Sequence, residues 1–559
     1  MTAVPLLRAP PFPWADAAMS RPLCSGERSS VEEHDLSSIL ERIRSAKVGG
    51  AFWDSPIRAA RCGGTVLRPR DADDMCLLLD ELEPVDRRLA LWVIPAAKRE
   101  KGFVERVLAN RGGEWCGPVD PWSVLPGAEC LLAHGDDEWI AIASILGIPV
   151  RVLSRGHYGS PGHEAEALVA NVGRVLANAT YLDPFTGAVA SVDATIDLLS
   201  DWRRMLESNR LIAVACGMAW WKRTEIRRLL WSPQRPLRMV FRPRTAVAQA
   251  KRAGGAVAIW PSRVSPELIE SARRQDVPLV RVEDGFVRST GLGSNLVPPS
   301  SVVVDHSGIH FDPSRPSDLE QILSETVFTP RLMARAHKLK EKILEGGISK
   351  YAAGSAAPPP ERQRGRKLVL VPAQVEDDMS VLAGGGGLCS NLELLQRVRA
   401  LEPEAEIWFR PHPDVDAGHR KGAVSDAEAL ALADRIVREP SIASLLDSVD
   451  AVHVLTSLTG FEALLRGRSV ACHGTPFYAG WGLTHDLGRV PDRRGRKLSL
   501  DELVAGVLIL YPRYLDPVTG LPCPPEVLVG RMATDRAPNR LGCLGPLRRL
   551  QGRVMASWR

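Results

Sequence analysis

Hydroxyl-bearing residues gather in the stretch 450–486, whose pattern is strand, turn, helix, strand and loop. Residues 451–455 form a short apolar run of β type, 456–460 a polar Thr-Ser-Leu-Thr-Gly turn, and 461–466 a helical continuation. Free N–H groups and the positive end of a helix dipole meet at such a strand-to-helix turn, so an anion binds there readily. The chemistry predicted for this stretch is the binding of a phosphate.

Two features of the same stretch have more than one explanation. Thr459 and Glu462 have the spacing of a capping box, so Glu462 either contacts a ligand or caps a helix. The loop 474–482, GTPFYAGWG, is richer in glycine and aromatic residues than an ordinary connection. Such a loop either stacks on a ligand ring or packs its own rings for stability.

Carboxylates follow two other predicted strands. Glu283 and Asp284 end one apolar run, and Glu376, Asp377 and Asp378 come shortly after another. If the two groups face each other across a cleft, one carboxylate can attack an anomeric carbon while another handles the proton of an acceptor hydroxyl. That is the two-carboxylate logic of retaining glycosyl transfer. The alternative is that these acidic loops are solvated turns or helix caps.

A histidine follows another strand in the sequence Arg410-Pro411-His412-Pro413. Together with the hydroxyl turn, this histidine would hold a phosphate and stabilise it as it leaves; the alternative is a structural histidine. That chemistry needs no metal, and neither a paired-aspartate motif nor a Cys/His cluster with zinc spacing stands out. The glycine run 384–387 lacks the Lys and Ser/Thr of a nucleotide P-loop, which indicates mobile backbone.

Alternating strands and helices have to position these residues, which predicts an α/β protein with parallel sheets. The predicted strands are 89–95, 130–133 and 148–153 in a first region, 210–216, 256–260, 278–282 and 301–305 in a second, and 367–372, 406–409, 451–455 and 470–472 in a third. Ligands bind at the carboxyl ends of parallel strands. The second and third regions are therefore expected to be two Rossmann-like domains facing a cleft.

Composition and pattern together suggest a domain plan. The expected parts are a flexible Pro-rich arm (1–35), an α/β domain (36–205), a first Rossmann-like domain (206–352), a linker (353–366), a second Rossmann-like domain carrying the hydroxyl turn (367–530) and a basic tail (531–559). The tail is either a solvated end or a segment that contacts an anionic membrane surface.

An internal repeat relates the first region to the third. Residues 87–102 resemble 404–422, 130–162 resemble 452–482, and 181–187 resemble 514–520, all in the same order. The first copy has Pro-Ala in place of Pro-His-Pro, and His-Gly-Asp in place of the hydroxyl turn, where its acid would repel a phosphate. The region 36–205 is thus predicted to be a degenerate donor-type Rossmann-like domain, kept for structure or for partner binding.

Composition also limits the function classes. A net charge of +5 on 559 residues is mild, and no basic run is interleaved with aromatic residues, so we expect no nucleic-acid partner. The ten cysteines form no CxxC pair, which favours reduced thiols. No apolar run is long enough to span a bilayer, and the Pro-broken start has no clear charged leader. We therefore expect a cytoplasmic protein without a signal peptide.

Six segments, taken together, resemble the bacterial capsule β-Kdo transferases of the KpsC type. They are RVEDGFVRSTGLGSNLVPPSSVVVDHSGIHFDPSRPSDLE, ISKY, LVPAQVEDDMS, IWFRPHPDV, TSLTGFEALLRG and GTPFYAGWGLT, in family order from about residue 205 to 530. The resemblance implies a GT-B glycosyltransferase with an acceptor-side domain at 206–352 and a nucleotide-sugar-binding domain at 367–530. It implies CMP-Kdo as donor, no cofactor or metal, and lyso-phosphatidylglycerol carrying a short β-linked Kdo oligosaccharide as the membrane-surface acceptor in capsule polysaccharide export. The implied location is cytoplasmic and peripheral at the inner membrane.

The resemblance also implies roles for single residues. Asp378, before Met379-Ser380, would be the nucleophile that forms a Kdo-enzyme adduct with net retention, and Glu283, beside Asp284, the acid/base. His412 and Ser457 would bind the CMP phosphate, with Glu462 at the ribose. The whole implied donor-binding set is Gln374, Arg410, His412, Thr456, Ser457, Thr459, Gly460, Glu462, Gly474 and Tyr478.

The chain departs from the family pattern in two ways. Ala373 precedes Gln374 where Gly is expected, and typical members carry two full catalytic modules, whereas this chain resembles the second module after a remnant of the first. If two linkages normally alternate, this chain makes only one, and either a second Kdo transferase or an export-complex partner makes the other, or the product differs. The alternatives are a GT-B transferase for another CMP-activated acidic sugar, such as a sialic acid, and a non-catalytic scaffold for capsule assembly.

Overall fold

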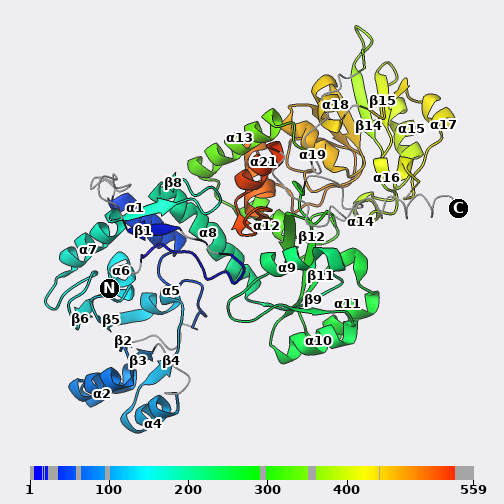
Figure 1. Cartoon of the computed structure of the whole chain (residues 1–559). Helices are drawn as coiled ribbons and strands as arrows, with labels where there is room; N and C mark the ends of the chain where they lie inside the picture. Colours follow the sequence, from blue (N-terminus) through cyan, green and yellow to red (C-terminus); the bar gives the residue numbers. More distant parts are fainter. Residues whose placement is uncertain are drawn as a thin grey trace. The chain divides into compact units, whose positions relative to one another are not determined.

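The computed structural model describes residues 5–15, 17, 19–22, 36–57, 64–94, 101–289, 297–349, 360–418, 420–439 and 441–534. The chain divides into two compact units (Figure 1). Unit 1 comprises Met1–Arg210 and Trp231–Pro236, and unit 2 comprises Leu211–Leu230 and Leu237–Arg559.

Unit 1 contains a five-stranded parallel sheet in the order β4-β3-β2-β5-β6 and a small antiparallel sheet in the order β1-β7-β8. Its elements are β1 (Ser20–Pro22), α1 (Leu36–Ala46), β2 (Gly64–Arg68), α2 (Ala72–Glu81), α3 (Pro84–Leu89), β3 (Leu91–Val93), α4 (Lys101–Arg111), β4 (Glu114–Cys116), α5 (Pro121–Val124), β5 (Ala128–Ala133), α6 (Trp139–Leu146), β6 (Val150–Val152), α7 (Ala165–Ala177), β7 (Ala179–Leu182), β8 (Val189–Ala190) and α8 (Val192–Asn209). The middle strand β2 is absent from the predicted strands, because its sequence GTVLR contains only a short apolar run.

The N-terminal arm, expected to be flexible over 1–35, is partly an ordered piece of unit 1. Leu6, Leu7 and Phe12 are buried, and β1 pairs antiparallel with β7. Apolar side chains removed from water stabilise the segment by about 25 cal/mol per Å² of buried area. The expectation of a flexible arm is therefore wrong for 5–15 and 19–22, while 1–4 and 23–35 lie outside the described residues.

Unit 2 contains a seven-stranded sheet in the order β10-β9-β11-β12-β13-β20-β21 and a six-stranded sheet in the order β16-β15-β14-β17-β18-β19. We call the parts built on these sheets the N-lobe and the C-lobe. The N-lobe elements up to the linker are β9 (Ile212–Cys216), the short 3₁₀ turn η4 (Trp220–Lys222), α9 (Arg223–Leu229), β10 (Arg238–Val240), α10 (Pro243–Arg252), β11 (Ala256–Ile259), η5 (Pro261–Arg263), α11 (Pro266–Arg274), β12 (Leu279–Asp284), β13 (Ser301–Asp305), α12 (Asp318–Glu325) and α13 (Pro330–Glu345).

The N-lobe is a Rossmann-like layer of helices on a mostly parallel sheet. Strands β10, β9, β11 and β12 are parallel, and β13 runs antiparallel to β12. Helices α10 and α11 pack on one face of the sheet around the apolar side chains of β9 and β11 (Figure 1). Helix α9 packs on the opposite face. The short strand β10 is absent from the predicted strands, because Arg238–Val240 is only half-buried and weakly apolar.

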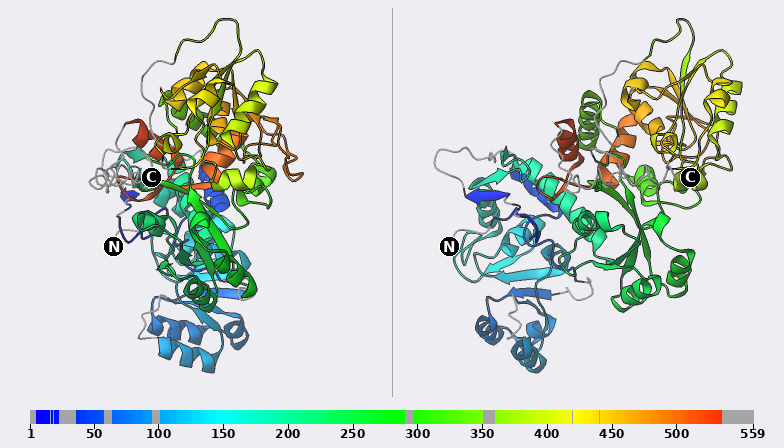
Figure 2. Two further views of the ribbon diagram at one scale, coloured as in Figure 1. Left: turned by 90° about the vertical axis from the view of Figure 1, so that its right-hand side faces the viewer. Right: turned by 45° about the vertical axis from the view of Figure 1, so that its right-hand side comes forward.

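The C-lobe is a parallel sheet with helices on both faces, as the yellow and orange helices of Figure 2 show. Its elements are β14 (Leu368–Pro372), α14 (Met379–Gly384), α15 (Asn391–Leu401), β15 (Glu406–Arg410), α16 (Pro413–Asp416), α17 (Asp426–Leu430), β16 (Arg435–Ile436), α18 (Ile442–Ser448), β17 (Ala451–Val454), α19 (Leu458–Leu465), β18 (Ser469–Cys472) and β19 (His485–Asp486). Strands β14, β15 and β17 are almost entirely buried and mostly apolar, as is typical of parallel strands covered on both faces. The predicted α/β class with Rossmann-like sheets is confirmed.

The chain end returns from the C-lobe to the N-lobe sheet. After α20 (Leu500–Val504) and a π-helical turn, η7 (Ala505–Leu510), strand β20 (Pro512–Leu515) pairs antiparallel with β13 and with β21 (Pro522–Cys523). Helix α21 (Pro525–Ala533) lies beside α13 (Figure 1). The predicted domain 367–530 thus ends too late, because a backbone pairing with β13 is invisible to local patterns. Of the predicted linker and basic tail, 353–359 and 535–559 lie outside the described residues.

The predicted repeat has a counterpart in the strand order. The order β4-β3-β2-β5-β6 of unit 1 matches β16-β15-β14-β17-β18 of the C-lobe, with parallel pairing throughout. The hairpin turns match as well: Asp183 Oδ2 accepts from Thr186 Oγ1 and Asp516 Oδ2 from Thr519 Oγ1, each at 2.9 Å. Strand β1 occupies beside β7 the position that β13 occupies beside β20.

Candidate active site

A buried glutamine connects the ends of two neighbouring strands in the C-lobe. Gln374 follows β14 and Thr456 follows β17, and these parallel neighbours bring both residues to the carboxyl edge of the sheet. Gln374 Nε2 donates to Thr456 Oγ1 at 3.0 Å, and the Thr456 amide donates to Gln374 Oε1 at 2.8 Å. Only 9% of Gln374 and 8% of Thr456 is exposed. The pair therefore holds the predicted hydroxyl turn in place.

The serine of that turn is the N-cap of helix α19. Ser457 Oγ accepts from the Thr459 amide at 3.2 Å and donates to Thr459 Oγ1 at 3.1 Å. Of the two explanations that the sequence left open for Glu462, the capping box with Thr459 does not hold, because the N-cap is Ser457, the helix begins at Leu458 and Glu462 is buried within it. Ser457 and Thr459 are half-buried, so their hydroxyls lie at the surface next to the positive end of the α19 dipole.

Gly460 gives Tyr478 room to pack against the same turn. A Cβ built on Gly460 would lie 2.2 Å from the Tyr478 hydroxyl oxygen, so any larger residue forces the ring away. Tyr478 is fully buried and its hydroxyl donates to the carbonyl of Ser457. Burial raises the pKa of Tyr478 well above its usual value. Both residues thus support the turn from inside the C-lobe.

The aromatic loop 474–482 packs as core. Phe477, Tyr478 and Trp481 are buried, and Trp481 Nε1 donates to the Phe477 carbonyl at 2.9 Å. Of the two explanations that the sequence left open, packing for stability is the one that the structure supports. The rings stack on one another, Phe477 and Tyr478 edge to face at 5.0 Å.

Two glycines bring the loop and helix α14 into contact. A Cβ on Gly474 would lie 2.6 Å from the Gly384 carbonyl, and the Thr475 amide donates to that carbonyl at 2.7 Å. The run 384–387 was expected to be mobile backbone. That expectation is wrong for Gly384 and Gly385, which are buried and end α14 with a 2.8 Å bond from the Gly385 amide to the Val381 carbonyl.

Asp378 is exposed, and the Ser380 hydroxyl lies between it and Thr456 of the hydroxyl turn. It caps α14, with Oδ1 accepting from the Ser380 amide at 2.9 Å and from Ser380 Oγ at 2.7 Å. Ser380 Oγ is 3.5 Å from Thr456 Oγ1. Among the described residues Oδ2 of Asp378 has no hydrogen-bond partner, whereas Asp377 is paired with Arg420 at 2.9 Å. A chain of polar contacts thus connects the predicted nucleophile to the predicted donor turn.

His412 and Arg410 lie at the end of the next strand, β15. His412 caps α16, and its Nδ1 accepts from the Asp414 amide at 3.2 Å, which assigns the proton of the neutral ring to Nε2. Arg410 Nη1 donates to the Val437 carbonyl at 3.1 Å, and burial lowers the pKa of Arg410. Since β15 is the parallel neighbour of β14, both residues reach the same edge as the hydroxyl turn.

The carboxylates Glu283 and Asp284 end β12 in the N-lobe. Lys222 Nζ lies 3.0 Å from Asp284 Oδ1, and Arg288 Nε lies 3.0 Å from Asp284 Oδ2. Two basic side chains thus fix this carboxylate from both oxygens, which favours a positioning role for Asp284. Glu283 is half-buried, and its Oε1 accepts from the Asp284 amide at 3.0 Å.

Exposure divides the predicted site residues into two groups. The residues that reach the surface, and so can touch a substrate, are Glu283, Asp284, Asp378, Arg410, His412, Ser457 and Thr459. The residues that are buried, and so shape the site, are Gln374, Thr456, Gly460, Glu462, Gly474 and Tyr478.

Aromatic and charged contacts connect the N-lobe motif around Glu283 with the aromatic loop of the C-lobe, both within unit 2. Phe286, two residues after Asp284, lies with its ring centroid 4.5 Å from that of Phe477 in the aromatic loop. Arg494 Nη1 donates to the carbonyl of Pro476 at 2.7 Å, and its Nε pairs with Glu320 of α12 at 2.6 Å. These contacts tie the loop after β18 to the lobe that carries Glu283.

Several residues of this arrangement were missed from sequence. Asn391 fixes Gln374 by donating to its carbonyl and accepting from its amide, both at 2.8 Å. Lys222 and the Glu320–Arg494 pair were also missed, since their partners are 62 and 174 residues away. Only Ser380 had a local signal, because it stands two residues after Asp378, where an N-cap aspartate meets its partner.

The matching edge of unit 1 is occupied by its own ion pairs. His134 Nε2 lies 2.8 Å from Asp74 Oδ2, and Arg68 Nε lies 2.9 Å from Asp137 Oδ2. A Cβ on Gly135 would lie 2.3 Å from the Gly159 carbonyl, so backbone approaches backbone where the C-lobe carries its hydroxyl turn.

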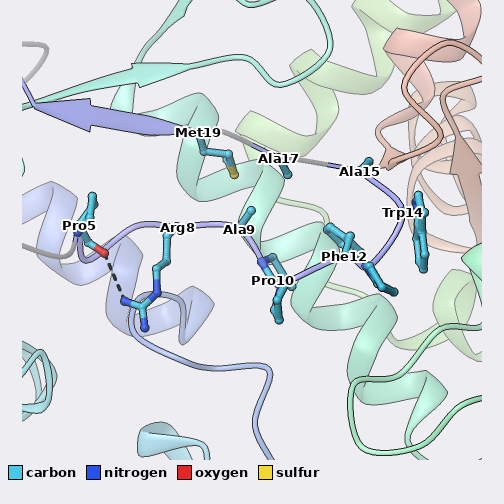
Figure 3. A pocket seen from close by; sticks show the side chains of 11 residues that line it. Pro5, Arg8, Ala9, Pro10, Phe12, Trp14, Ala15, Ala17 and Met19 are labelled. Atoms are coloured by element: carbon cyan, nitrogen blue, oxygen red, sulfur yellow. Dashed lines mark hydrogen bonds between the residues drawn. The ribbon is translucent and has the colours of Figure 1, made fainter.

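A hollow of about 810 Å³ lies in unit 1, whereas every predicted site residue lies in unit 2 (Figure 3). One segment lines it, and within that segment Arg8 Nη1 donates to the Pro5 carbonyl at 3.3 Å. In the part of the chain that the structure describes, no group of three His, Cys, Asp or Glu side chains could hold a metal ion. In the same part, no helix is long and apolar enough to cross a membrane.

Comparisons with known proteins find similarity to proteins of capsule polysaccharide and lipopolysaccharide metabolism. A family model described as "Capsule polysaccharide biosynthesis protein" matches residues 255–514, which include every predicted site residue. The chain is 42% identical over 342 residues to the capsule polysaccharide modification protein LipA of Neisseria meningitidis serogroup A, which covers 61% of this chain and 48% of LipA. It is 47% identical over 250 residues to the lipopolysaccharide-processing protein LpsZ of Rhizobium meliloti, over 44% of this chain and 56% of LpsZ. The chain thus spans about half the length of these curated relatives.

A solved structure gives the corresponding match in three dimensions. It is described as "Thermosulfurimonas dismutans KpsC, beta Kdo 2,4 transferase" and is 32% identical to this chain, with a TM-score of 0.50. The match covers 58% of this chain and 98% of the solved chain.

Proposed function

Because this chain belongs to the KpsC-type family of capsule polysaccharide proteins, we propose that it is a retaining glycosyltransferase that moves Kdo from CMP-Kdo to a lipid-linked acceptor. The observation that carries the proposal is the contact chain Asp378–Ser380–Thr456–Gln374. It holds an exposed carboxylate beside a helix N-terminus at the carboxyl edge of a parallel sheet. A nucleophile and a phosphate site have to lie next to each other for transfer from a sugar nucleotide.

The proposed reaction has two displacements. In the first, an oxygen of Asp378 bonds to the anomeric carbon while the bond from that carbon to the phosphate oxygen breaks, and CMP leaves with the electron pair. Ser457, His412 Nε2–H and the positive end of the α19 dipole stabilise the charge on the departing phosphate. In the second, an acceptor hydroxyl bonds to the same carbon as the Asp378 ester bond breaks, and Glu283 takes the hydroxyl proton. Two inversions give net retention.

The proposed acceptor is a poly-Kdo linker on lyso-phosphatidylglycerol, so the protein would work at the inner membrane surface during capsule export. The matching edge of unit 1 carries ion pairs in place of a hydroxyl turn, which supports one donor site in this chain. A second Kdo transferase or an export-complex partner would then make any alternating linkage.

Intact mass spectrometry of the full chain with CMP-Kdo generated in situ tests the proposal. The wild type should gain the mass of one Kdo residue, and Asp378→Asn should not. Asn is as good an N-cap as Asp, so this variant keeps α14 capped. Its free energy of unfolding should lie within about 0.5 kcal/mol of the wild-type value. The matched control is Asp377→Asn, an adjacent exposed carboxylate paired with Arg420, which should still form the adduct.

Other outcomes of this experiment would identify a different nucleophile, a different donor or a non-catalytic role. An adduct that survives in Asp378→Asn would keep the donor and move the nucleophile to Asp377 or Glu283. An adduct with CMP-sialic acid in place of CMP-Kdo would identify another acidic sugar as the donor. If no adduct forms and calorimetry detects no binding of either donor, the transferase proposal is contradicted and a capsule-assembly scaffold is favoured.

A further inference from the structure

The N-lobe has a hollow of its own at the carboxyl ends of three parallel strands. Its volume is about 320 Å³, and it lies between the residues that follow β9, β10 and β11. Carboxyl ends of parallel strands are where ligands bind in open α/β sheets. None of the predicted site residues lines this hollow.

Two large aromatic side chains line the hollow and face water. Trp220, in η4, is 56% exposed, and Phe241, directly after β10, is 72% exposed. Most large aromatic side chains of unit 2 are buried, so two exposed rings at one hollow need an explanation. Ring faces of this kind stack on the apolar face of a sugar or on an aliphatic chain.

Two guanidinium groups lie beside these rings. Arg223 Cζ is 4.2 Å from the centroid of the Phe241 ring, and Arg263, exposed at the end of η5, also lines the hollow. Among the described residues, neither Arg223 nor Arg263 forms an ion pair with a carboxylate, although many arginines of this chain do; Arg223 Nε donates to the Met218 carbonyl at 3.3 Å. Arginines without a carboxylate partner in a hollow are available to a ligand anion.

The short turn η4 joins this hollow to the carboxylates of the proposed reaction. Trp220 lines the hollow, and Lys222, two residues further along, pairs with Asp284 at 3.0 Å and lies 3.5 Å from the Trp260 ring centroid. Since β12 is the parallel neighbour of β11, Glu283 ends at the same sheet edge. A ligand in the hollow would therefore lie next to the proposed acid/base.

We propose that this hollow holds the anionic terminal sugar of the acceptor. This inference rests on the proposed function, because it places an acceptor subsite beside the proposed transfer site. The sugar's carboxylate binds Arg223 and Arg263, and its ring lies against Trp220 and Phe241. A volume near the lower end of ligand pockets suits one sugar ring and not a lipid tail.

Acceptor kinetics of the full chain test the subsite. The double variant Arg223→Gln/Arg263→Gln should raise the acceptor KM about tenfold or more, as the loss of charged hydrogen bonds does. The donor KM and the hydrolysis of CMP-Kdo without acceptor should stay unchanged, because the donor residues lie on the other lobe. Phe241→Ala, which removes an exposed ring together with its contact to Arg223, should also raise the acceptor KM. The matched control, Arg273→Gln on the exposed side of α11, should change neither constant.

A binding measurement separates this proposal from the transferase itself. Calorimetry with the methyl β-glycoside of Kdo should show binding that the double variant weakens about tenfold, even if no donor is turned over. Methyl glucoside, which has no carboxylate, should bind at least tenfold more weakly. Equal binding of the two glycosides, displacement by inorganic phosphate alone, or an unchanged acceptor KM in both variants would overturn the proposal.

Discussion

Gly460 and Tyr478 together fix the turn that precedes helix α19. The Tyr478 hydroxyl occupies the space where a Cβ of residue 460 would be, and from there it donates to the Ser457 carbonyl. The N-cap of α19 is therefore fixed by a ring from a loop 21 residues away. The position of this N-cap therefore depends on close packing between Gly460 and Tyr478, which leaves no space for another side-chain atom.

Gly460→Ala should destabilise unit 2. The added methyl meets the Tyr478 oxygen at 2.2 Å, and forcing a side chain into a packed core costs about 1–3 kcal/mol. The companion Gly460→Ala/Tyr478→Phe should recover part of that loss, because the clashing oxygen is gone. As a matched control, Gly530→Ala in α21, where no atom lies within 4 Å of the new Cβ, should be neutral or slightly stabilising. Urea unfolding measures all three; a Gly460→Ala protein as stable as the wild type would contradict the tight packing.

Strands β17 and β18 are joined by a buried histidine pair as well as by their backbones. His453 Nδ1 lies 3.1 Å from His473 Nε2, and both rings are buried. Burial, together with the nearby charges of His453, Arg397 and His485, lowers the pKa of His473 to about 4. Glu402 faces His453 on the other side, with its Oε1 3.5 Å from Nε2.

Acid should therefore weaken the C-lobe before its carboxylates are protonated. The folded pKa of His473 is about 4 and the ordinary value is 6.5, so between these pH values the unfolded chain binds more protons. The free energy of unfolding then falls as the pH drops, by about 2 kcal/mol between pH 7 and pH 5 for this single group.

Urea unfolding of His473→Gln at several pH values measures this contribution. The variant keeps a hydrogen-bonding partner for His453 but does not titrate, so its stability should change less between pH 7 and pH 5. His485→Gln, an exposed histidine on β19, should keep most of the wild-type slope. Equal slopes in wild type and His473→Gln would show that His473 is not the group that titrates.

At the scale of unit 2, one buried ion pair holds the aromatic loop of the C-lobe to helix α12 of the N-lobe. Arg494 is 1% exposed and Glu320 7% exposed at their side chains, and Arg494 also donates to two carbonyls of the loop. A buried pair of this kind is worth little compared with an apolar pair, but breaking it leaves a charge without its partner.

Arg494→Met should lower the free energy of unfolding of unit 2 by about 3 kcal/mol, near the lower end for a broken buried pair because Arg493 also contacts Glu320. The double variant Arg494→Met/Glu320→Gln should lose less than the sum of the two single variants. Arg438→Met, which breaks exposed pairs with Asp416 and Asp426, is the matched control and should cost less than about 1 kcal/mol per pair. Calorimetric unfolding measures the two single variants, the double variant and the control; strict additivity would mean that the two side chains do not interact.

The sequence by itself determined the local parts of this protein. The strands β13, β14, β15, β17 and β18, the strand-to-helix turn at Thr456–Thr459, and the repeat of one strand order in two units follow from apolar runs, hydroxyl residues and repeated motifs. These signals lie within a few residues of the structure they specify. Candidates such as Asp378, His412 and Ser457, none of which is buried, do follow the strands that the sequence predicted.

Only the tertiary structure decided which of these residues face a substrate and which support the others. Gln374 meets Thr456 across 82 residues, Lys222 meets Asp284 across 62, and β20 joins the N-lobe sheet across more than 200. Tyr478 became a core residue because Gly460 left it space, and no local pattern reports that space. The physical reason is that hydrogen bonds and close packing join residues by distance in space, while a single sequence orders them only along the chain.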